Sequence, residues 1–250
     1  MTVAAPRFVH LRCHSEFSIV DGILRIDEAV AAASADAMPA LAMTDFNNLF
    51  GLIKFYKAAR KAGIKPLVGA EISIVQKKPR AAPYRMLLLV QSRTGYLNLC
   101  ALLTRAYQTQ EAHHGQVGIA PEWLHEHHEG LLLIAGARGS EIGEALLQGD
   151  TETAETWARS WARIFPDRFY LEVQRAGHAD DDLLVAACAD LARRLHLPLV
   201  ATHPVQFKTR DDFRAHDARV CISEGYTLSD TRRPQRFTPE QYFTTQAEMA

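Results

Sequence analysis

Continuous apolar runs alternate with stretches of helical periodicity along almost all of this 250-residue chain. An apolar run of about 4–8 residues that ends in polar side chains is typical of a buried parallel strand. Such runs lie at residues 8–11, 40–45, 66–74, 86–90, 131–135, 169–175 and 197–203. About seven strand and helix alternations, with no long linker between them, predict an α/β fold with a closed or nearly closed parallel barrel.

Helices are predicted between these runs wherever apolar residues recur near a 3.6-residue spacing. The second helix is expected to begin at a cap formed by Asn48 and to end at Gly63. The other predicted helices are 26–35, 95–108, 122–127, 141–147, 153–164, 181–195 and 212–224. Trp157 and Trp161 are one helical turn apart, which favours a core contact over a platform for base stacking.

The sequence lacks the features of several other protein classes. No Gly-x-Gly-x-x-Gly or Walker A motif follows a strand, so neither a dinucleotide fold nor a P-loop fold has support. The 28 basic and 29 acidic residues give a net charge of −1, whereas a free-standing nucleic-acid binder has a basic excess. Any contact with DNA is therefore expected to be shared with another region or chain.

Cysteine usage and hydropathy indicate a soluble protein of the cytoplasm with no contact to a membrane. The cysteines Cys13, Cys100, Cys188 and Cys221 are far apart and form no Cys-x-x-Cys pair, so no disulfide framework or thiolate zinc site is indicated. The first residues carry no apolar signal core, and no window approaches the roughly 18 apolar residues of a membrane span.

The stretch 10–22 carries the most chemistry, because polar side chains follow the first apolar run. His10, Arg12 and His14 alternate, so in an extended chain they would point to one side and could converge on a metal ion. The central residue is an arginine, which has no lone pair to offer a cation. A metal site built on this stretch is therefore incomplete.

Several segments together resemble the PHP (polymerase and histidinol phosphatase) domains at the N-terminus of bacterial DNA polymerase III alpha subunits. They are residues 10–18, 21–22, 42–51, 63–71, 94–99 and 242–243, and the similarity extends over essentially the whole chain. The resemblance implies a distorted seven-stranded (β/α)7 barrel of PHP type at 1–228. Residues 229–250 are then expected to be a linker and the truncated start of a following polymerase domain. Thr245 and Glu248 would cap a helix there that frays.

Active members of this family hold a cluster of metal ions with His, Asp and Glu side chains at one mouth of the barrel. At the matching positions, His14, Asp21 and Glu71 keep a metal-ligand residue type. The ligands are replaced at the other matching positions, which are Arg12, Phe46, Arg85, Ala176, Pro204 and Gln206. His10, Glu172 and His203 are possible neighbours of this vestigial metal pocket, and His203 could be a substitute ligand.

The replaced ligands predict that the domain has no catalytic residue, no bound metal and no cofactor. A metal cluster needs about three ligands for each ion, and two arginines place fixed positive charge where the cations would lie. We therefore expect His14, Asp21 and Glu71 to be buried, hydrogen-bonded remnants. We also expect Arg12 and Arg85 to pair with Asp21, Glu71 or Glu172, in place of the metal ions.

The resemblance implies a role within a DNA-directed DNA polymerase, a nucleotidyltransferase of DNA replication. Its Mg²⁺ ions would belong to a polymerase domain outside this chain. The domain itself would be a structural module that docks the proofreading exonuclease (epsilon) subunit, with the remaining holoenzyme subunits and DNA bound through the parent chain. The alternative is a metal-dependent phosphoesterase or pyrophosphatase with a reduced metal site. For the basic stretch 232–236, contact with a nucleic-acid backbone and a solvated linker remain equally open.

Overall fold

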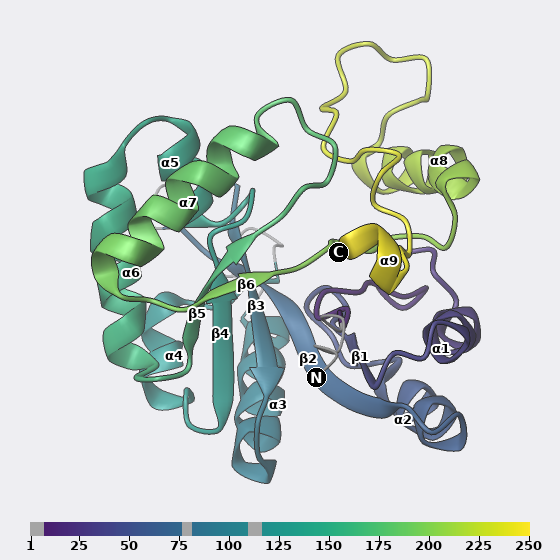
Figure 1. The fold of residues 1–250 in the computed structure, drawn as a ribbon, viewed down its shortest axis with the longest axis horizontal. Coiled ribbons are helices and arrows are strands. Elements are labelled where there is room, and N and C mark those ends of the chain that lie inside the picture. The colour runs from purple at the N-terminus through teal and green to yellow at the C-terminus, as the bar shows by residue number, and fades with distance from the viewer. Residues whose placement is uncertain (1–7, 77–81, 110–116) are drawn as a thin grey trace, which may run out of the picture. The chain divides into compact units, whose positions relative to one another are not determined.

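The computed structural model describes residues 8–76, 82–109 and 117–250, which group into two compact units. The first unit contains the chain up to Asp45, residues 49–67 and everything from His203 onward. The second contains residues 46–48 and 68–202 (Figure 1). Each unit is described by itself.

The fold is of the α/β class, and its six described strands form one sheet in the order β1-β2-β3-β4-β5-β6. β2 begins in the first unit and ends in the second. The strands are β1 (Ala40–Met43), β2 (Lys65–Ile74), β3 (Tyr84–Val90), β4 (Leu131–Ala135), β5 (Phe169–Val173) and β6 (Leu199–Ala201). The prediction of an all-parallel sheet is wrong in part. The β4-β5-β6 pairs are parallel, but β2-β3 and β3-β4 are antiparallel. Residues 75–83 are too short a connection for the crossover that a parallel β2-β3 pair needs.

The strand predicted at 8–11 does not form as a regular strand in the described residues. The chain at 10–14 is instead held between two neighbours within the first unit. On one side the backbone N–H of Ala42 donates to the His10 carbonyl at 2.9 Å, and on the other that of His14 donates to the Val205 carbonyl at 2.9 Å. Cys13 and Val205 form an isolated parallel bridge. The segment thus runs beside β1 without a continuous ladder.

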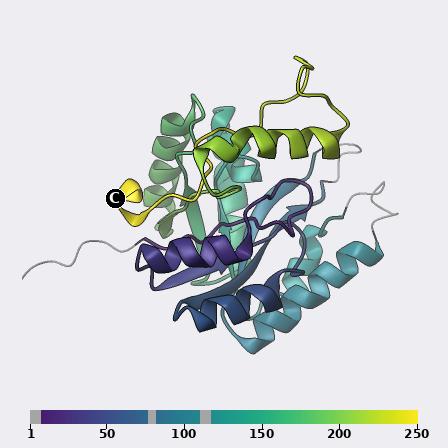
Figure 2. The ribbon, with the colours of Figure 1, turned by 90° about the vertical axis from the view of Figure 1, so that its right-hand side faces the viewer.

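The helices of the first unit are α1 (Ile26–Ala35), α2 (Leu52–Lys61), α8 (Phe213–Glu224) and α9 (Gln246–Met249), with a short 3-10 helix at Arg210–Asp212. α1 and α2 lie side by side (Figure 2). The predicted cap on α2 is wrong, because the helix begins after Gly51 and the Asn48 amide donates to the Phe46 carbonyl instead.

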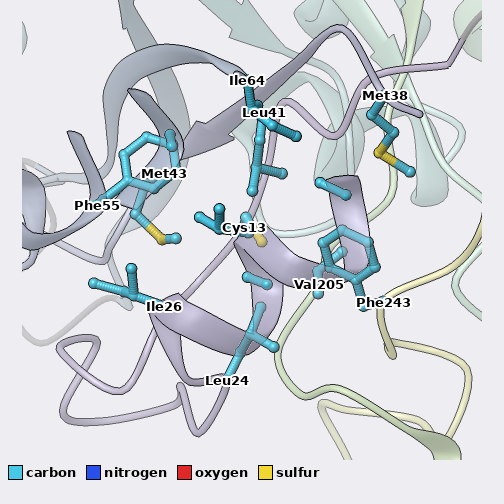
Figure 3. Close-up of a cluster of buried hydrophobic side chains, with 14 residues drawn as sticks. Cys13, Leu24, Ile26, Met38, Leu41, Met43, Phe55, Ile64, Val205 and Phe243 are labelled. Atoms are coloured by element: carbon cyan, nitrogen blue, oxygen red, sulfur yellow. The ribbon is translucent and has the colours of Figure 1, made fainter. Parts of the chain in front are cut away.

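An apolar core holds the first unit together. One face each of α1, α2 and β1, together with neighbouring loop residues, supplies buried side chains that pack around Cys13 (Figure 3). They include Leu24, Ile26, Met38, Leu41, Met43, Phe55, Ile64, Val205 and Phe243. Phe243 lies only a few residues before α9, so the segment that leads to α9 belongs to this core.

The last helix also differs from the expectation that it would fray. Thr245 and Glu248 form the predicted capping box, so that part of the prediction is confirmed. In addition, the backbone N–H of Gln246 donates to the Asp36 carboxylate at 2.8 Å, and its side-chain amide donates to the Asp36 carbonyl. One turn of helix is too short to be stable alone, and these tertiary contacts hold it.

The second unit carries helices against β3, β4 and β5. They are α3 (Arg93–Gln108), α4 (Pro121–Glu126), α5 (Glu141–Leu147), α6 (Thr151–Ile164) and α7 (Asp181–Leu195). α3 packs on β3 and β4, whereas α7 packs on β5 and α5 contacts both α6 and α7 (Figure 1). The Trp157 and Trp161 rings stack with centroids 6.4 Å apart, and Trp161 is buried, so the predicted core contact is confirmed.

Within the described part of the chain, no helix combines the length and apolar character needed to cross a bilayer.

Candidate functional site

The positions predicted to form the vestigial metal pocket are distributed over both units. The first unit contains His10, Arg12, His14, Asp21, His203, Pro204 and Gln206. The second contains Phe46, Glu71, Arg85, Glu172 and Ala176. The two groups are treated separately.

In the second unit the structure brings Phe46, Glu71 and Arg85 together. Ser73 on β2 lies opposite Arg85 on β3, so Glu71, two residues away, shares a face with Arg85 at the diagonal position. The Arg85 Nη1 lies 3.1 Å from Glu71 Oε1. Phe46 forms a parallel bridge to Glu71, and the Arg85 guanidinium carbon is 4.1 Å from the centroid of its ring. The guanidinium therefore contacts both an anion and an aromatic face.

This arrangement confirms the predicted pairing of Arg85 with Glu71. The Glu71 side chain is only 4% exposed and that of Arg85 is 26% exposed, so the pair is largely shielded from water. A buried carboxylate needs a compensating charge, and the guanidinium provides one in a low-dielectric setting. The predicted pairing of Arg12 stays a prediction, although its side chain is buried as expected.

A metal ion does not fit these three residues. A guanidinium has no lone pair for a cation, and a phenyl ring offers no ligand atom of the kind that zinc or manganese takes from proteins. The fixed positive charge of Arg85, already bound to the retained carboxylate, would repel an incoming divalent ion. Across residues 8–76, 82–109 and 117–250, no group of three or more His, Cys, Asp or Glu side chains has the geometry to hold a metal.

In the first unit His14 and Asp21 form a buried pair. The His14 Nδ1 lies 2.9 Å from the Asp21 Oδ1, and both side chains are almost completely inaccessible to water. The His216 Nε2 donates to the Asp21 backbone carbonyl at 2.7 Å, which connects α8 to this pair. The contact of His216 with Asp21 was not predicted from the sequence. The two residues are 195 positions apart in the chain, and no local pattern indicates a contact over that separation.

Asp45 is a second buried carboxylate that the motif comparison missed. The Ser15 backbone N–H and hydroxyl donate to its two oxygens at 2.6 and 2.9 Å. Burial is the largest effect on Asp45 and raises the pKa of its carboxyl, although the bonds from Ser15 act in the opposite direction. Asp45 lies two residues after the end of β1, in the apolar run predicted at 40–45, and that position at a strand end was the available signal.

His10 and His203 both bond to the segment before α9. The His10 Nε2 lies 2.8 Å from the Thr244 carbonyl, and the His203 Nε2 lies 3.0 Å from the Tyr242 carbonyl. A carbonyl oxygen can only accept, so each ring donates through Nε2. Burial lowers the pKa of both rings, that of His10 to about 4. These bonds assign the two histidines to packing of the C-terminal segment.

We predict that the His10 ring stays neutral in the folded chain down to about pH 5. Because its folded pKa lies below the ordinary 6.5, the unfolded chain takes up the proton first, and stability is lost as the pH falls from 6.5 toward 4. Proton NMR titration of the ring, assigned with a His10→Asn variant, measures this directly. The same chain unfolded in urea is the control, where the ring should titrate near 6.5. A midpoint above 6 in the folded chain would contradict the prediction.

The remaining predicted positions make other local contacts. The buried Glu172 carboxylate accepts hydrogen bonds from the Thr202 hydroxyl and, at 3.1 Å, from the Gln174 amide. The Ala176 backbone N–H donates to Asp181 at 2.7 Å, and the Gln206 backbone N–H donates to the Gln241 carbonyl at 2.9 Å. Pro204 is buried.

The basic stretch 232–236 is neutralised by carboxylates. Arg232 pairs with Asp230, Arg233 binds Asp217 through both terminal nitrogens, and Arg236 pairs with Glu224. These pairs fix the loop to α8 and to itself. They reduce the net charge of the stretch, while both alternatives, contact with a nucleic-acid backbone and a solvated linker, stay predictions.

Comparison with known proteins identifies the family of this chain. Residues 10–176 match the PHP domain family, and the chain belongs to that family. The chain is 44% identical over 250 residues to DNA polymerase III subunit alpha of Pseudomonas aeruginosa, covering all of this chain and 21% of the relative. It is 41% identical over 247 residues to the same subunit of Escherichia coli strain K12, covering 99% of this chain and 21% of the relative. The chain thus spans about one fifth of the length of these relatives.

A solved structure supports the fold. It is an amidohydrolase from Chromobacterium violaceum with bound sulfate and no metal, with a TM-score of 0.56 and 17% sequence identity. The match covers 84% of this chain and 96% of that chain. At this identity the likeness concerns the fold alone, which is PHP-like.

Proposed function

We propose that this chain is the PHP domain of a bacterial replicative DNA polymerase, the alpha subunit of DNA polymerase III. The identity of 41–44% across the whole chain, rather than in isolated motifs, supports this assignment. Template-directed nucleotidyl transfer and its Mg²⁺ ions would belong to the parts of the relatives that this chain does not span. DNA and the other holoenzyme subunits would be bound through that longer polymerase in the cytoplasm.

We further infer that the barrel of the family is completed by the segment 10–14. Its backbone bonds to β1 on one side and to Val205 on the other support this inference, because a seventh strand of a closed barrel would have a neighbour on each side. Pairing between this segment and Val205 consists of the single bridge at Cys13, so no continuous ladder forms there.

The domain itself is proposed to have no hydrolytic activity. The contact of Arg85 with both Glu71 and Phe46 carries this proposal, because it joins three positions that hold metal ligands in active members of the family. Two of the three can no longer bind a metal, and the third is engaged by a guanidinium. A phosphoesterase or pyrophosphatase with a reduced metal site has no comparable observation in its favour.

We predict that the R12H/R85H double variant does not regain hydrolysis of a phosphodiester or of pyrophosphate. Phe46, Ala176, Pro204 and Gln206 would still leave the cluster short of ligands. The assay uses bis-p-nitrophenyl phosphate, an oligonucleotide and pyrophosphate with added Mn²⁺ or Zn²⁺, and an active family member as positive control. Turnover by the double variant above that of the unmodified chain would contradict the argument.

The proposed role of the domain is to dock the proofreading exonuclease subunit. A domain that has lost its own metal ligands but keeps its core can still be maintained by selection on its binding surface alone. The test is a pull-down and calorimetric titration of the purified chain with the exonuclease subunit encoded by the same genome. If no one-to-one complex forms, the docking role is refuted. The polymerase assignment is tested separately, by primer extension with the full-length subunit.

A further inference from the structure

The outer face of α2 exposes large apolar side chains. Phe55 and Ala59 point into the core of the first unit and are fully buried. At 100° per residue, Ile53, Lys57 and Arg60 lie on the opposite side of the helix, and Tyr56 lies at the edge of that side, next to Arg60. Ile53 is 63% exposed and Tyr56 is 49% exposed, so this face presents two apolar side chains to solvent.

The same face has an excess of positive charge. Between residues 46 and 70 the sequence has five basic residues and no acidic one, although the whole chain has a net charge of −1. Lys54 is neutralised by Glu16 at 2.8 Å and also approaches Asp27. In the described part of the chain, Lys57, Arg60 and Lys61 are exposed and make no ion pair. Three uncompensated cations therefore lie beside the two exposed apolar side chains.

We propose that this α2 face, formed by Ile53, Tyr56, Lys57, Arg60 and Lys61, binds an acidic amphipathic helix of a partner protein. Such a helix would cover Ile53 and Tyr56 with its apolar stripe, and its flanking glutamates or aspartates would pair with the cations. Tyrosine and arginine are the residue types that most often dominate such contacts. The inference is independent of the proposed function.

Charge and shape argue against two other occupants. A second copy of the chain would bring the same cations face to face, which is unfavourable. Single-stranded nucleic acid is held in grooves by several aromatic rings on which successive bases stack, whereas this convex face has an aliphatic residue beside a single ring. An acidic helix satisfies both the apolar and the charged part of the surface.

The first test is titration of the isotopically labelled chain with a model peptide, followed by NMR. The peptide has about 18 residues, with leucines at i, i+3 and i+4 spacing and glutamates on either side of the stripe. We expect amide shifts concentrated on α2, and binding that weakens as salt is raised. The control peptide has the same composition in an order that destroys the leucine stripe. Equal affinity for both peptides would overturn the proposal.

Matched variants separate the apolar and charged contributions. Ile53→Ser and the triple variant K57E/R60E/K61E should each weaken binding by at least about tenfold. The control triple R93E/K208E/R214E makes the same charge change at exposed positions outside α2 and should change the affinity by less than about twofold. A uniform effect of both triples, or preferential binding of oligothymidine to α2, would refute an acidic helix as the ligand.

Discussion

Replacing Arg85 with alanine is expected to lower the free energy of unfolding by about 3 kcal/mol. The substitution removes the guanidinium 3.1 Å from the Glu71 carboxylate and leaves that nearly inaccessible charge without this partner. It also removes the contact with the Phe46 ring. Truncating one member of a buried pair is worse than removing both, because the remaining charge keeps its desolvation penalty. Urea unfolding followed by circular dichroism gives the difference.

A double-mutant cycle assigns this loss to the pair. Glu71→Gln in the Arg85→Ala background should recover at least about 1 kcal/mol, because a neutral amide is easier to bury than an unpaired carboxylate. Arg175→Ala is the matched control, since its pairing with Asp182 is highly exposed and should contribute little. If Arg85→Ala is no more destabilising than Arg175→Ala, the guanidinium does not have the cohesive role assigned to it.

The Arg85–Glu71 pair could be predicted from sequence because the argument needed only charge. Glu71 lies within a buried apolar strand, so its carboxylate required compensation, and an arginine stood at a neighbouring family position. The orientation of the strands could not be predicted in the same way. A strand buried on both faces has the same apolar run in either direction, and only the short connection 75–83 decides that β2 and β3 are antiparallel.

The histidines show where the pattern argument fails. Alternation places His10 and His14 on one side only if residues 8–14 form a regular strand, and the structure has isolated bridges there instead. His14 bonds to Asp21, whereas His10 bonds to Thr244, which is 234 residues away in the chain. No local spacing predicts a contact of that separation. For the same reason the core position of Phe243 was not predicted.

Glu141 is a buried acid in the second unit that has no role in the vestigial pocket. It occupies the first turn of α5, and one of its oxygens accepts a hydrogen bond from the Trp161 indole N–H on α6. The Oε2 atom has no hydrogen-bond partner in the part of the chain that the structure describes. Burial raises the pKa of Glu141 to about 7, against the opposing effect of its hydrogen bonds. The carboxyl is therefore more easily held in its protonated form.

The chain should consequently lose stability as the pH rises from about 4.5 to about 7, by up to about 3 kcal/mol from this residue alone. The folded pKa exceeds that of the unfolded chain, so the folded state binds the proton more tightly, and that advantage is complete below 4.5 and gone above 7. Glu141→Gln keeps an acceptor for Trp161 but cannot ionise. Its stability relative to the unmodified chain should therefore increase from about pH 5 to about pH 7 and then level off in urea unfolding experiments. The matched variant Glu152→Gln, at an exposed position on α6, should show no such trend. Parallel profiles for the Glu141 variant and the unmodified chain would mean that the carboxyl is already ionised at low pH and that the unpaired oxygen is solvated.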